Sequence, residues 1–270
     1  MSSSLRRILA LLMASALMFA ACGDSDSDAS TDDGSGDPEP SGEVELVSAG
    51  TLSVCSDTPY EPFEFEGDDG EQTGYDIDLL RAIADENSLD LEVIDLPFDG
   101  ILGSLAAGDC DVVASALSIT DERKQQVDFS GPYFDADQSL LIRSDDEGTI
   151  TALDDVTGTI GVQSGTTGAD YAEENAPEGA EVKSFEDADG LFGALTSGDI
   201  DAILQDFPVN AFRATQDDSF VVTEKFPTPD QYGFAVKKDN PTVLALVDDG
   251  LETIRANGTF DTIFQTYFGA

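Results

Sequence analysis

The side chains available for chemistry in this chain are carboxylates, hydroxyls and a few arginines, because none of its 270 residues is histidine. Mechanisms that use Ser-His pairs, Cys-His pairs or histidine-bound metals are therefore excluded, which removes most hydrolases and zinc enzymes. Lys and Arg number 12 against 56 Asp and Glu, so the formal net charge is −44. Such a charge disfavours nucleic acids and anionic membrane surfaces as partners.

Arg123 and Asp206 are the charged residues whose surroundings favour a buried role. Arg123 follows the loop after an expected strand, and its planar guanidinium can hold a carboxylate through two hydrogen bonds. Asp206 follows an expected buried strand and precedes Pro208. Each residue has an ordinary alternative. For Arg123 it is a surface arginine at the start of a short 121–126 helix, and for Asp206 it is one solvated carboxylate among many.

The N-terminal residues have the pattern of an export signal. Arg6 and Arg7 precede an apolar run over 8–21, which is too short to span a bilayer and typical of a secretory signal peptide over 1–21. Residues 19–22 (FAAC) resemble a bacterial lipobox with Phe19 in place of the usual leucine, so Cys22 is the expected lipidation site. Plain secretion with an incidental cysteine is the alternative. Residues 22–43 then form an acidic tether without apolar clusters.

Short apolar strands alternate with amphipathic helices from residue 52 onward, which predicts an α/β fold with mostly parallel strands. Strands are expected over 52–56, 91–95 and 111–115, with helices over 76–86 and 99–107, and a similar series covers 159–212. Further helices are expected over 242–256 and 259–268.

The chain also contains an internal repeat. Residues 99–113 (DGILGSLAAGDCDVV) recur as 189–203 (DGLFGALTSGDIDAI), with seven of fifteen positions identical. The pattern predicts two lobes of similar build, and chance similarity between two common helix-turn-strand units is the alternative. Ligands of open α/β sheets bind beyond the carboxyl ends of strands. Candidate site residues therefore follow the two repeated strands: Ser115, Ala116 and Ser118 in one lobe, and Gln205 and Asp206 in the other.

Two extended segments, 138–142 and 231–236, are expected to cross between the lobes and act as a hinge. They divide the chain into a first lobe of 44–138 plus 236–270 and a second lobe of 139–235. Cys55 falls late in one expected strand and Cys110 at the start of another, so the two are expected to be offset along a parallel sheet. We therefore expect two buried thiols instead of a disulfide.

Several motifs together resemble a known family. They are residues 57–65 (DTPYEPFEF), 74–79 (GYDIDL), 98–102 (FDGIL), 117–124 (LSITDERK), 127–133 (VDFSGPY), 163–167 (QSGTT) and 257–260 (NGTF). In this order and spacing they are similar to family 3 of the bacterial extracellular solute-binding proteins, the receptors of polar amino-acid uptake transporters. The resemblance covers roughly residues 46–269. It implies a two-lobed periplasmic-binding-protein-like fold joined by two hinge strands.

The resemblance also implies how an amino acid is bound. Arg123 receives the α-carboxylate, with donors from Thr166 and Thr167. Asp206, the Ser118 hydroxyl and the Ala116 carbonyl receive the ammonium, and Gln205 flanks the pocket. The ligand side chain then meets four residues, namely Asp57, Tyr60, Phe98 and Ser115. Two aromatic faces with a carboxylate beyond them suit a basic side chain or a primary amide, whereas both aromatics could equally be ordinary core residues.

The expected function is therefore an extracytoplasmic, lipid-anchored monomer that captures a polar, basic amino acid for an ABC permease, without a cofactor or metal. Glutamine or another polar amino acid is the alternative ligand. Two other classes of protein stay open. One is an enzyme similar to dehydratases of cyclic amino-acid precursors, and the other is a lipoprotein that senses its ligand without transporting it.

Overall fold

The computed structural model describes residues 44–269, which form two lobes, each built around a five-stranded sheet. The expected signal peptide, Cys22 and the acidic tether lie outside the described residues. In the part that the structure describes, no helix is both long and apolar enough to cross a membrane.

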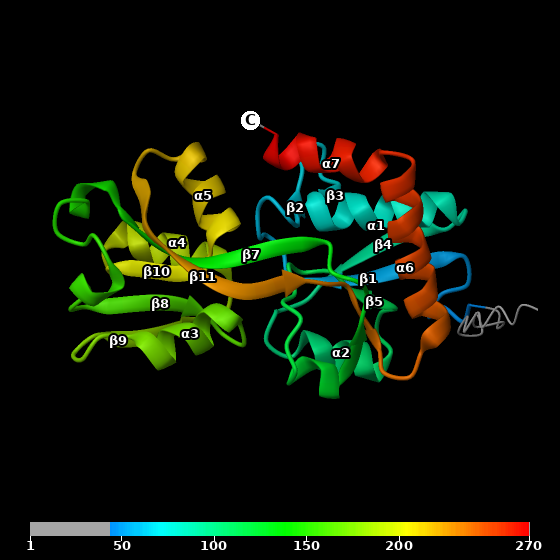
Figure 1. Ribbon diagram of the computed structural model, residues 1–270, viewed down its shortest axis with the longest axis horizontal. Coiled ribbons are helices and arrows are strands. Elements are labelled where there is room, and N and C mark those ends of the chain that lie inside the picture. The colour runs from blue at the N-terminus through cyan, green and yellow to red at the C-terminus, as the bar shows by residue number, and fades with distance from the viewer. Residues whose placement is uncertain (1–43, 270) are drawn as a thin grey trace, which may run out of the picture. The chain divides into compact units, whose positions relative to one another are not determined.

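The first sheet has the strand order β4-β1-β5-β12-β6. Its strands are β1 (Thr51–Ser56), β4 (Asp90–Asp95), β5 (Val112–Val113), β6 (Val127–Phe129) and β12 (Ala235–Lys237). β1 is parallel to β4 and β5, whereas β12 is antiparallel to β5 and β6. Helices α1 (Tyr75–Glu86), α6 (Pro241–Ala256) and α7 (Thr259–Phe268) cover one face, and α2 (Ile101–Ala107) covers the other (Figure 1). A short ribbon of β2 (Phe65–Glu66) and β3 (Gln72–Thr73) precedes α1.

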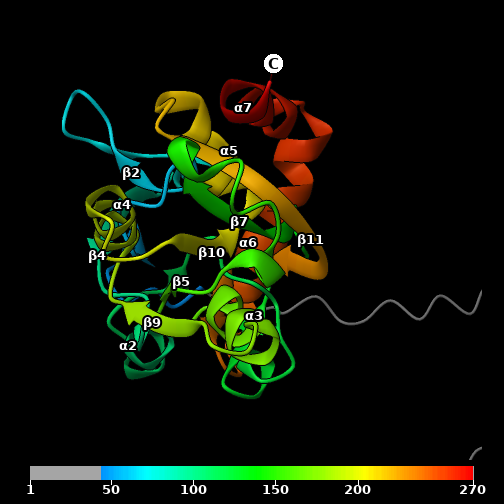
Figure 2. The same ribbon diagram turned by 90° about the vertical axis from the view of Figure 1, so that its left-hand side faces the viewer.

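The second sheet has the order β11-β7-β10-β8-β9. Its strands are β7 (Phe134–Arg143), β8 (Thr159–Gln163), β9 (Glu181–Phe185), β10 (Ala202–Asp206) and β11 (Phe220–Tyr232). β8 is parallel to β9 and β10, and β7 is antiparallel to β10 and β11. Seen from this lobe, α3 (Thr167–Asn175) lies on one face, and α4 (Ala188–Ser197) and α5 (Phe207–Gln216) lie on the other (Figure 2).

These elements confirm the two-lobed α/β fold, but each sheet is mixed, with two parallel and two antiparallel pairings. Apolar alternation reports burial and does not report strand direction, so the antiparallel partners were not distinguishable in the sequence. Short 3₁₀ turns occur at Arg123–Gln125, Ser144–Asp146 and Leu153–Asp155. The first replaces the short helix expected over 121–126.

The internal repeat has a structural counterpart. The unit β1-α1-β4-α2-β5 gives the strand order β4-β1-β5, and β8-α3-β9-α4-β10 gives the equivalent order β9-β8-β10. Both repeated helices end on a left-handed glycine, Gly108 with φ 87° and Gly198 with φ 79°. A residue with a side chain is strained in this conformation, so both turns need glycine.

The chain crosses between the sheets at two adjacent places. One crossing joins β6 to β7 over 130–133, and the other joins β11 to β12 over 233–234. Backbone hydrogen bonds tie them together, from Ser130 N to Phe234 O (2.9 Å) and from Tyr133 N to Tyr232 O (3.0 Å). The expected segment 231–236 contains the second crossing. The expected segment 138–142 is not a crossing, because it lies wholly within β7 (Phe134–Arg143), a strand of the second sheet.

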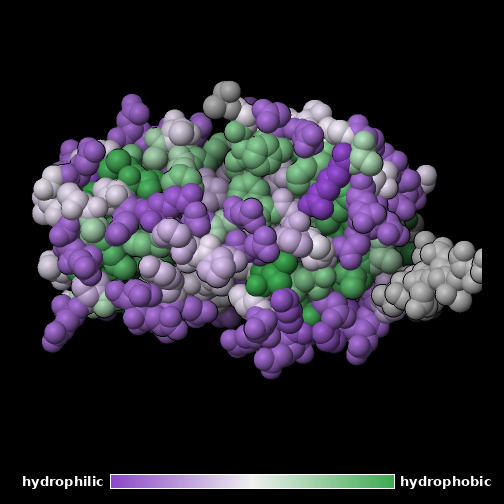
Figure 3. Space-filling model, in the orientation of Figure 1, coloured by the Kyte–Doolittle hydropathy of each residue, from purple (hydrophilic) through white to green (hydrophobic). Residues whose placement is uncertain are grey.

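The surface is polar, as the charge requires. Among residues 44–269 only Val44 and Val47 are exposed large apolar side chains. Hydrophilic residues accordingly cover most of the face drawn in Figure 3.

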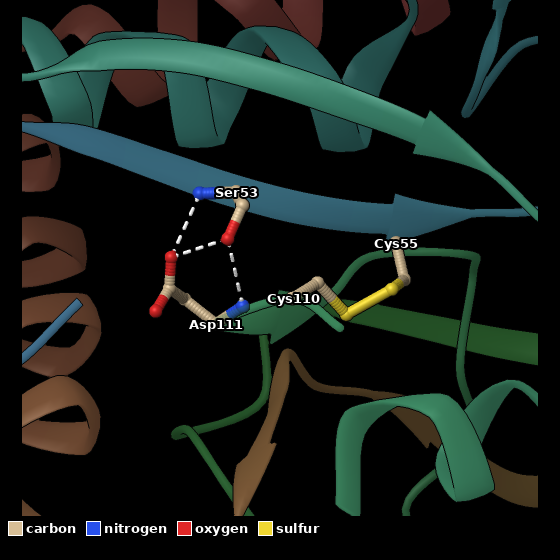
Figure 4. Close-up of a disulfide and its surroundings, with 4 residues drawn as sticks. All are labelled: Ser53, Cys55, Cys110 and Asp111. Atoms are coloured by element: carbon tan, nitrogen blue, oxygen red, sulfur yellow. Dashed lines mark hydrogen bonds between the residues drawn. A yellow bond between two sulfur atoms is a disulfide. The ribbon is translucent and has the colours of Figure 1, made fainter. Parts of the chain in front are cut away.

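Cys55 and Cys110 form a disulfide, so the expectation of two free thiols was wrong (Figure 4). Their Cα atoms lie 5.8 Å apart. The expected offset assumed that Cys110 begins a strand, but β5 starts at Val112 and pairs with β1 in register with Val54. Cys110 therefore belongs to the segment between α2 and β5, outside the sheet, where it can lie against the face of β1 that Cys55 faces.

Replacing both cysteines should destabilise the protein. In Cys55→Ala/Cys110→Ala we expect the free energy of unfolding to fall by about 2–4 kcal/mol, because the disulfide closes a loop between residues 55 positions apart. Urea denaturation followed by circular dichroism measures this. A reducing agent should lower the wild-type midpoint and leave that of the double variant unchanged; equal midpoints for all samples would contradict the disulfide's contribution.

Candidate functional site

A small cavity of about 20 Å³ lies where the carboxyl ends of parallel strands from both sheets meet. Ten of the eleven predicted ligand-binding residues line it, together with one that was not predicted, Gln163. The lining residues are Asp57, Tyr60, Phe98, Ser115, Ala116, Ser118, Arg123, Gln163, Thr166, Thr167 and Asp206.

Arg123 spans the cavity from the first lobe toward the second. Its Nη1 donates to the Ser118 carbonyl (2.8 Å) and its Nη2 to the Gly165 carbonyl (3.0 Å). The guanidinium carbon lies 5.4 Å from the centre of the Phe98 ring, within the range of a cation–π contact. Burial lowers the pKa of Arg123, and the nearby Asp206 is the strongest influence in the opposite direction. The guanidinium is therefore a partly buried positive charge held by two backbone carbonyls.

Asp206 ends β10, directly before α5, and is only 8% exposed. Its carboxylate accepts hydrogen bonds from the hydroxyls of Tyr60 (2.9 Å) and Tyr232 (2.6 Å) and from the amide of Gln138. Burial raises the pKa of Asp206 above its ordinary value, and the three donors act against this by stabilising the charged form. Tyr60 belongs to the first lobe, so its hydrogen bond to Asp206 is a direct contact between the two lobes.

Asp57 and Gln163 form a second contact between the lobes. The Gln163 amide donates to Asp57 Oδ2 (2.6 Å) and to the Glu186 carbonyl (3.2 Å). Asp57 is held by its own backbone N–H, which donates to the Ser115 hydroxyl (3.1 Å). Burial raises the pKa of Asp57 to about 6, although the Gln163 amide lowers it. Asp57 therefore changes charge close to neutral pH.

The loop after β5 supplies backbone groups to the cavity. Ala116 has a left-handed conformation, with φ 43°, and its N–H donates to Asp76 Oδ2 (2.9 Å). The Ser118 hydroxyl lies 3.3 Å from that of Thr167. Alanine rarely adopts a positive φ, and the buried hydrogen bond to Asp76 holds Ala116 in that conformation.

The N-terminus of α3 forms the second lobe's wall. Thr166 caps this helix, because its hydroxyl accepts from Ala169 N (3.1 Å) and donates to the Gln163 carbonyl (2.8 Å). The expected hydroxyl donor at Thr166 is therefore occupied by the cap, and Thr167 begins the helix beside it. The positive end of the helix dipole favours an anion at this wall.

Gln205 is the predicted residue that does not line the cavity. Its amide donates to Asn210 Oδ1 (2.9 Å), and the residue is 4% exposed. Successive residues of a strand point to opposite faces, so Gln205 and Asp206 could not both face the cavity. Gln163 was missed because the strand-end rule was applied only to the repeated strands. Applied to β8, the same rule would have identified it.

Within residues 44–269 no group of three or more Cys, Asp or Glu is arranged to hold a metal ion. The chemistry of the cavity is instead that of paired charges: a guanidinium against the Phe98 ring and a helix N-terminus on one side, and carboxylates with the Tyr60 ring on the other.

Replacing Asp57 with asparagine should stabilise the protein in a pH-dependent way. The folded-state pKa of about 6 exceeds the ordinary 3.8, so the native state holds a proton that the unfolded chain releases. The free energy of unfolding therefore falls as pH rises from about 4 to about 6. The gain in urea midpoint for Asp57→Asn should grow from pH 5 to pH 7.5. The exposed control Asp90→Asn should show no such growth, and an equal gain at both pH values for Asp57→Asn would refute the assignment.

Comparison with known proteins identifies the family. Residues 52–270 match the model of bacterial extracellular solute-binding proteins, family 3. The chain is 33% identical to the L-cystine-binding protein TcyJ of Escherichia coli over 82% of this chain and 84% of that protein. It is 32% identical to ABC transporter arginine-binding protein 1 of Escherichia coli, over 77% of this chain and 87% of that protein. A solved structure of an ancestral arginine-binding protein bound to arginine is similar, with a TM-score of 0.76 and 35% identity over 82% of this chain and 99% of that one. The chain therefore belongs to family 3 of the bacterial extracellular solute-binding proteins.

Proposed function

We propose that this protein binds a free amino acid with a basic side chain between its lobes and delivers it to an ABC permease. The observation that carries the proposal is the placement of Arg123 and Asp206 in the wall of one cavity, each on a different lobe. Among the relatives, one is named for arginine and an ABC transporter, and one solved structure holds arginine.

The two ends of a free amino acid match the two kinds of charge in the cavity. An α-amino acid is a zwitterion, and its charges can leave water only if opposite charges or hydrogen bonds replace the solvent. Arg123 and the N-terminus of α3 lie together at the carboxylate end, because Arg123 reaches Gly165, two residues before Thr167. Asp206, the Ser118 hydroxyl and the Ala116 carbonyl provide acceptors for the ammonium. Ser118 O already accepts from Arg123, which ties the two ends together.

The side-chain end of the cavity favours a cation. Asp57 lies at the boundary between the cavity and an outer recess that both lobes line. Four further carboxyls line that recess, namely Asp95, Glu186, Asp187 and Asp189. Tyr60 and Phe98 supply aromatic faces. A guanidinium or ammonium in this region gains ion-pair and cation–π contacts. Glutamine, which was the alternative from the sequence, would gain hydrogen bonds without the ionic attraction.

Closure of the lobes provides the signal to the transporter. The adjacent crossings at 130–133 and 233–234 form a hinge, and contacts such as Gln163–Asp57 and Tyr60–Asp206 join the lobes across the cavity. A ligand that contacts both walls favours the closed arrangement over an open one. We propose that a permease docks on the closed form and that the bound amino acid leaves chemically unchanged.

A lipid on Cys22 would hold the receptor at the membrane where its permease lies. Attachment of this kind raises the effective concentration of the receptor near the permease. Residues 22–43 carry acidic and small residues that suit a solvated spacer.

Cys22→Ser should therefore abolish membrane attachment. In a bacterial host, the wild-type chain is expected in the detergent phase after phase separation, and the variant in the aqueous phase, because only the wild type carries acyl chains. The variant Cys55→Ala/Cys110→Ala keeps Cys22 and serves as the matched control. Partition of the wild type into the aqueous phase would contradict lipidation.

A thermal-shift panel of the twenty amino acids plus ornithine and cystine tests the ligand class. Arginine, lysine, ornithine or histidine should give the largest shift, because the carboxylates and aromatic rings at the side-chain end attract a cation. A ligand at a hundred times its dissociation constant adds about 2.7 kcal/mol to stability. Arg123→Ala should abolish every shift, since loss of one partner of a buried charge pair costs roughly 3–5 kcal/mol.

Arg81→Ala is the matched control, because Arg81 is a partly exposed arginine on α1 that does not line the cavity. It should keep the wild-type shifts. A largest shift with glutamate or leucine would contradict the assignment of the side-chain end. Conversion of the leading ligand to a new compound during incubation would favour the enzyme alternative.

A further inference from the structure

Two carboxyl groups lie behind the cavity wall without lining it. Glu64 and Asp76 are both 0% exposed. Glu64 ends the turn that begins at Tyr60, and Asp76 lies in the first turn of α1. Gly74 allows these segments to meet, because a Cβ there would lie 2.2 Å from the Phe63 carbonyl oxygen. The close approach is completed by Asp76 N, which donates to Phe63 O (3.0 Å).

Each carboxyl holds one residue of the cavity wall. Glu64 Oε1 accepts from the Ser115 hydroxyl (3.1 Å), and the same hydroxyl accepts from Asp57 N. Asp76 Oδ2 accepts from Ala116 N (2.9 Å) and keeps that residue at its positive φ of 43°. Ala116 is the expected carbonyl acceptor for the ammonium, and Ser115 is expected to meet the ligand side chain. Each carboxyl therefore lies one hydrogen bond away from a proposed ligand contact.

The remaining oxygens of the pair are buried without a hydrogen-bond partner. These are Glu64 Oε2 and Asp76 Oδ1. A carboxylate oxygen in that condition is costly, whereas a carboxylic acid there can donate to a neighbouring acceptor.

The charges around the pair are negative or neutral. The charges of Asp57 and Asp206 raise the pKa of Glu64, and the Tyr133 hydroxyl donates to Asp76 Oδ2 (2.6 Å). Within residues 44–269, no Lys or Arg forms an ion pair with either carboxyl. Burial raises the pKa of Asp76 to about 7; burial, followed by the charge of Asp76, raises the pKa of Glu64 well above its ordinary value. Two such carboxyls cannot both ionise at moderate pH.

We propose that Glu64 and Asp76 share one proton and act as positioning residues that hold Ser115 and Ala116 in the cavity wall, so that ligand affinity falls when this proton is lost. The proposal rests on the proposed amino-acid binding and adds a pH dependence to it. The single negative charge that the pair keeps lies at the N-terminus of α1, where the helix dipole stabilises it.

The sign of the effect follows from the proton. The native state holds a proton that the unfolded chain releases near the ordinary carboxyl pKa, 3.8 for Asp76. The free energy of unfolding therefore falls as pH rises from about 4 toward about 7. Above that range the pair gains a negative charge beside the charges of Asp57 and Asp206, and this repulsion displaces the wall that the pair holds.

Glu64→Gln removes a titrating proton and keeps the hydrogen bond to Ser115, because the amide oxygen can still accept from that hydroxyl and the amide carries no titrating proton. Urea denaturation of the protein without ligand from pH 5 to pH 8.5 should give a midpoint that falls less steeply in Glu64→Gln than in the wild type. Asp57 and Asp206 are present in both proteins, so their titration cancels. The exposed Glu66→Gln is the matched control and should follow the wild type.

Calorimetric titration with arginine at pH 6 and pH 8.5 measures the link to binding. The wild type should lose about tenfold in affinity, the change that corresponds to one pKa unit. Glu64→Gln should lose less than about twofold over the same range, since the ionisation of the ligand is common to both proteins.

Infrared spectra supply a readout of the protonated carboxyl itself. At pH 6 the variant Asp57→Asn, which lacks the carboxyl that itself titrates near 6, should still show the carbonyl stretch of a protonated carboxyl, and this stretch should disappear by pH 8.5. Asp76→Asn replaces the other member of the pair and should reproduce the flatter denaturation profile if Glu64→Gln does not fold. Equal pH slopes in the wild type and either folded variant, or no protonated carboxyl at pH 6, would overturn the shared proton. Absence of arginine binding at both pH values would instead contradict the proposed function, and the denaturation profile would still test the pair.

Discussion

The cavity depends on one constraint, that a charge leaves water only where opposite charge or hydrogen bonds replace the solvent. Arg123, the arginine that lines the cavity, is held by the carbonyls of Ser118 and Gly165. Asp206 is surrounded by three donors from two lobes. In this arrangement both groups are therefore held in place by the protein's own hydrogen bonds. Preorganised charges of this kind reduce the cost of binding.

The duplicated topology explains why these groups meet. In β1-α1-β4-α2-β5 and in β8-α3-β9-α4-β10, the parallel strands end at the same edge of their sheets. Asp57 follows β1, Ser115 follows β5, Gln163 ends β8 and Asp206 ends β10. Because the two edges face one cavity, both lobes contribute polar groups to its wall. The chain passes from one lobe to the other at two adjacent crossings, 130–133 and 233–234.

Local sequence patterns were sufficient for the helices, most strands and the cavity residues that follow the repeated strands. The family resemblance supplied the others, namely Asp57, Tyr60, Phe98, Thr166 and Thr167. The 99–113 and 189–203 repeat indicated two similar lobes, and strand ends pointed to Ser115 and Asp206. What the sequence lacked was information on partners distant along the chain. The Cys55–Cys110 disulfide depends on where β5 begins. The side-chain direction of Gln205 depends on which face of β10 is covered. The pairing of Glu64 with Asp76 depends on how the turn at 60–64 packs against α1.

A crystal structure of the protein with bound L-arginine tests the central claim most directly. The account predicts the α-carboxylate against the Arg123 guanidinium and the N-terminus of α3, and the α-ammonium against Asp206, with the ligand guanidinium toward Asp57. An amino acid bound in the reverse orientation, or bound outside this cavity with Arg123 and Asp206 making no contact to it, would contradict the account.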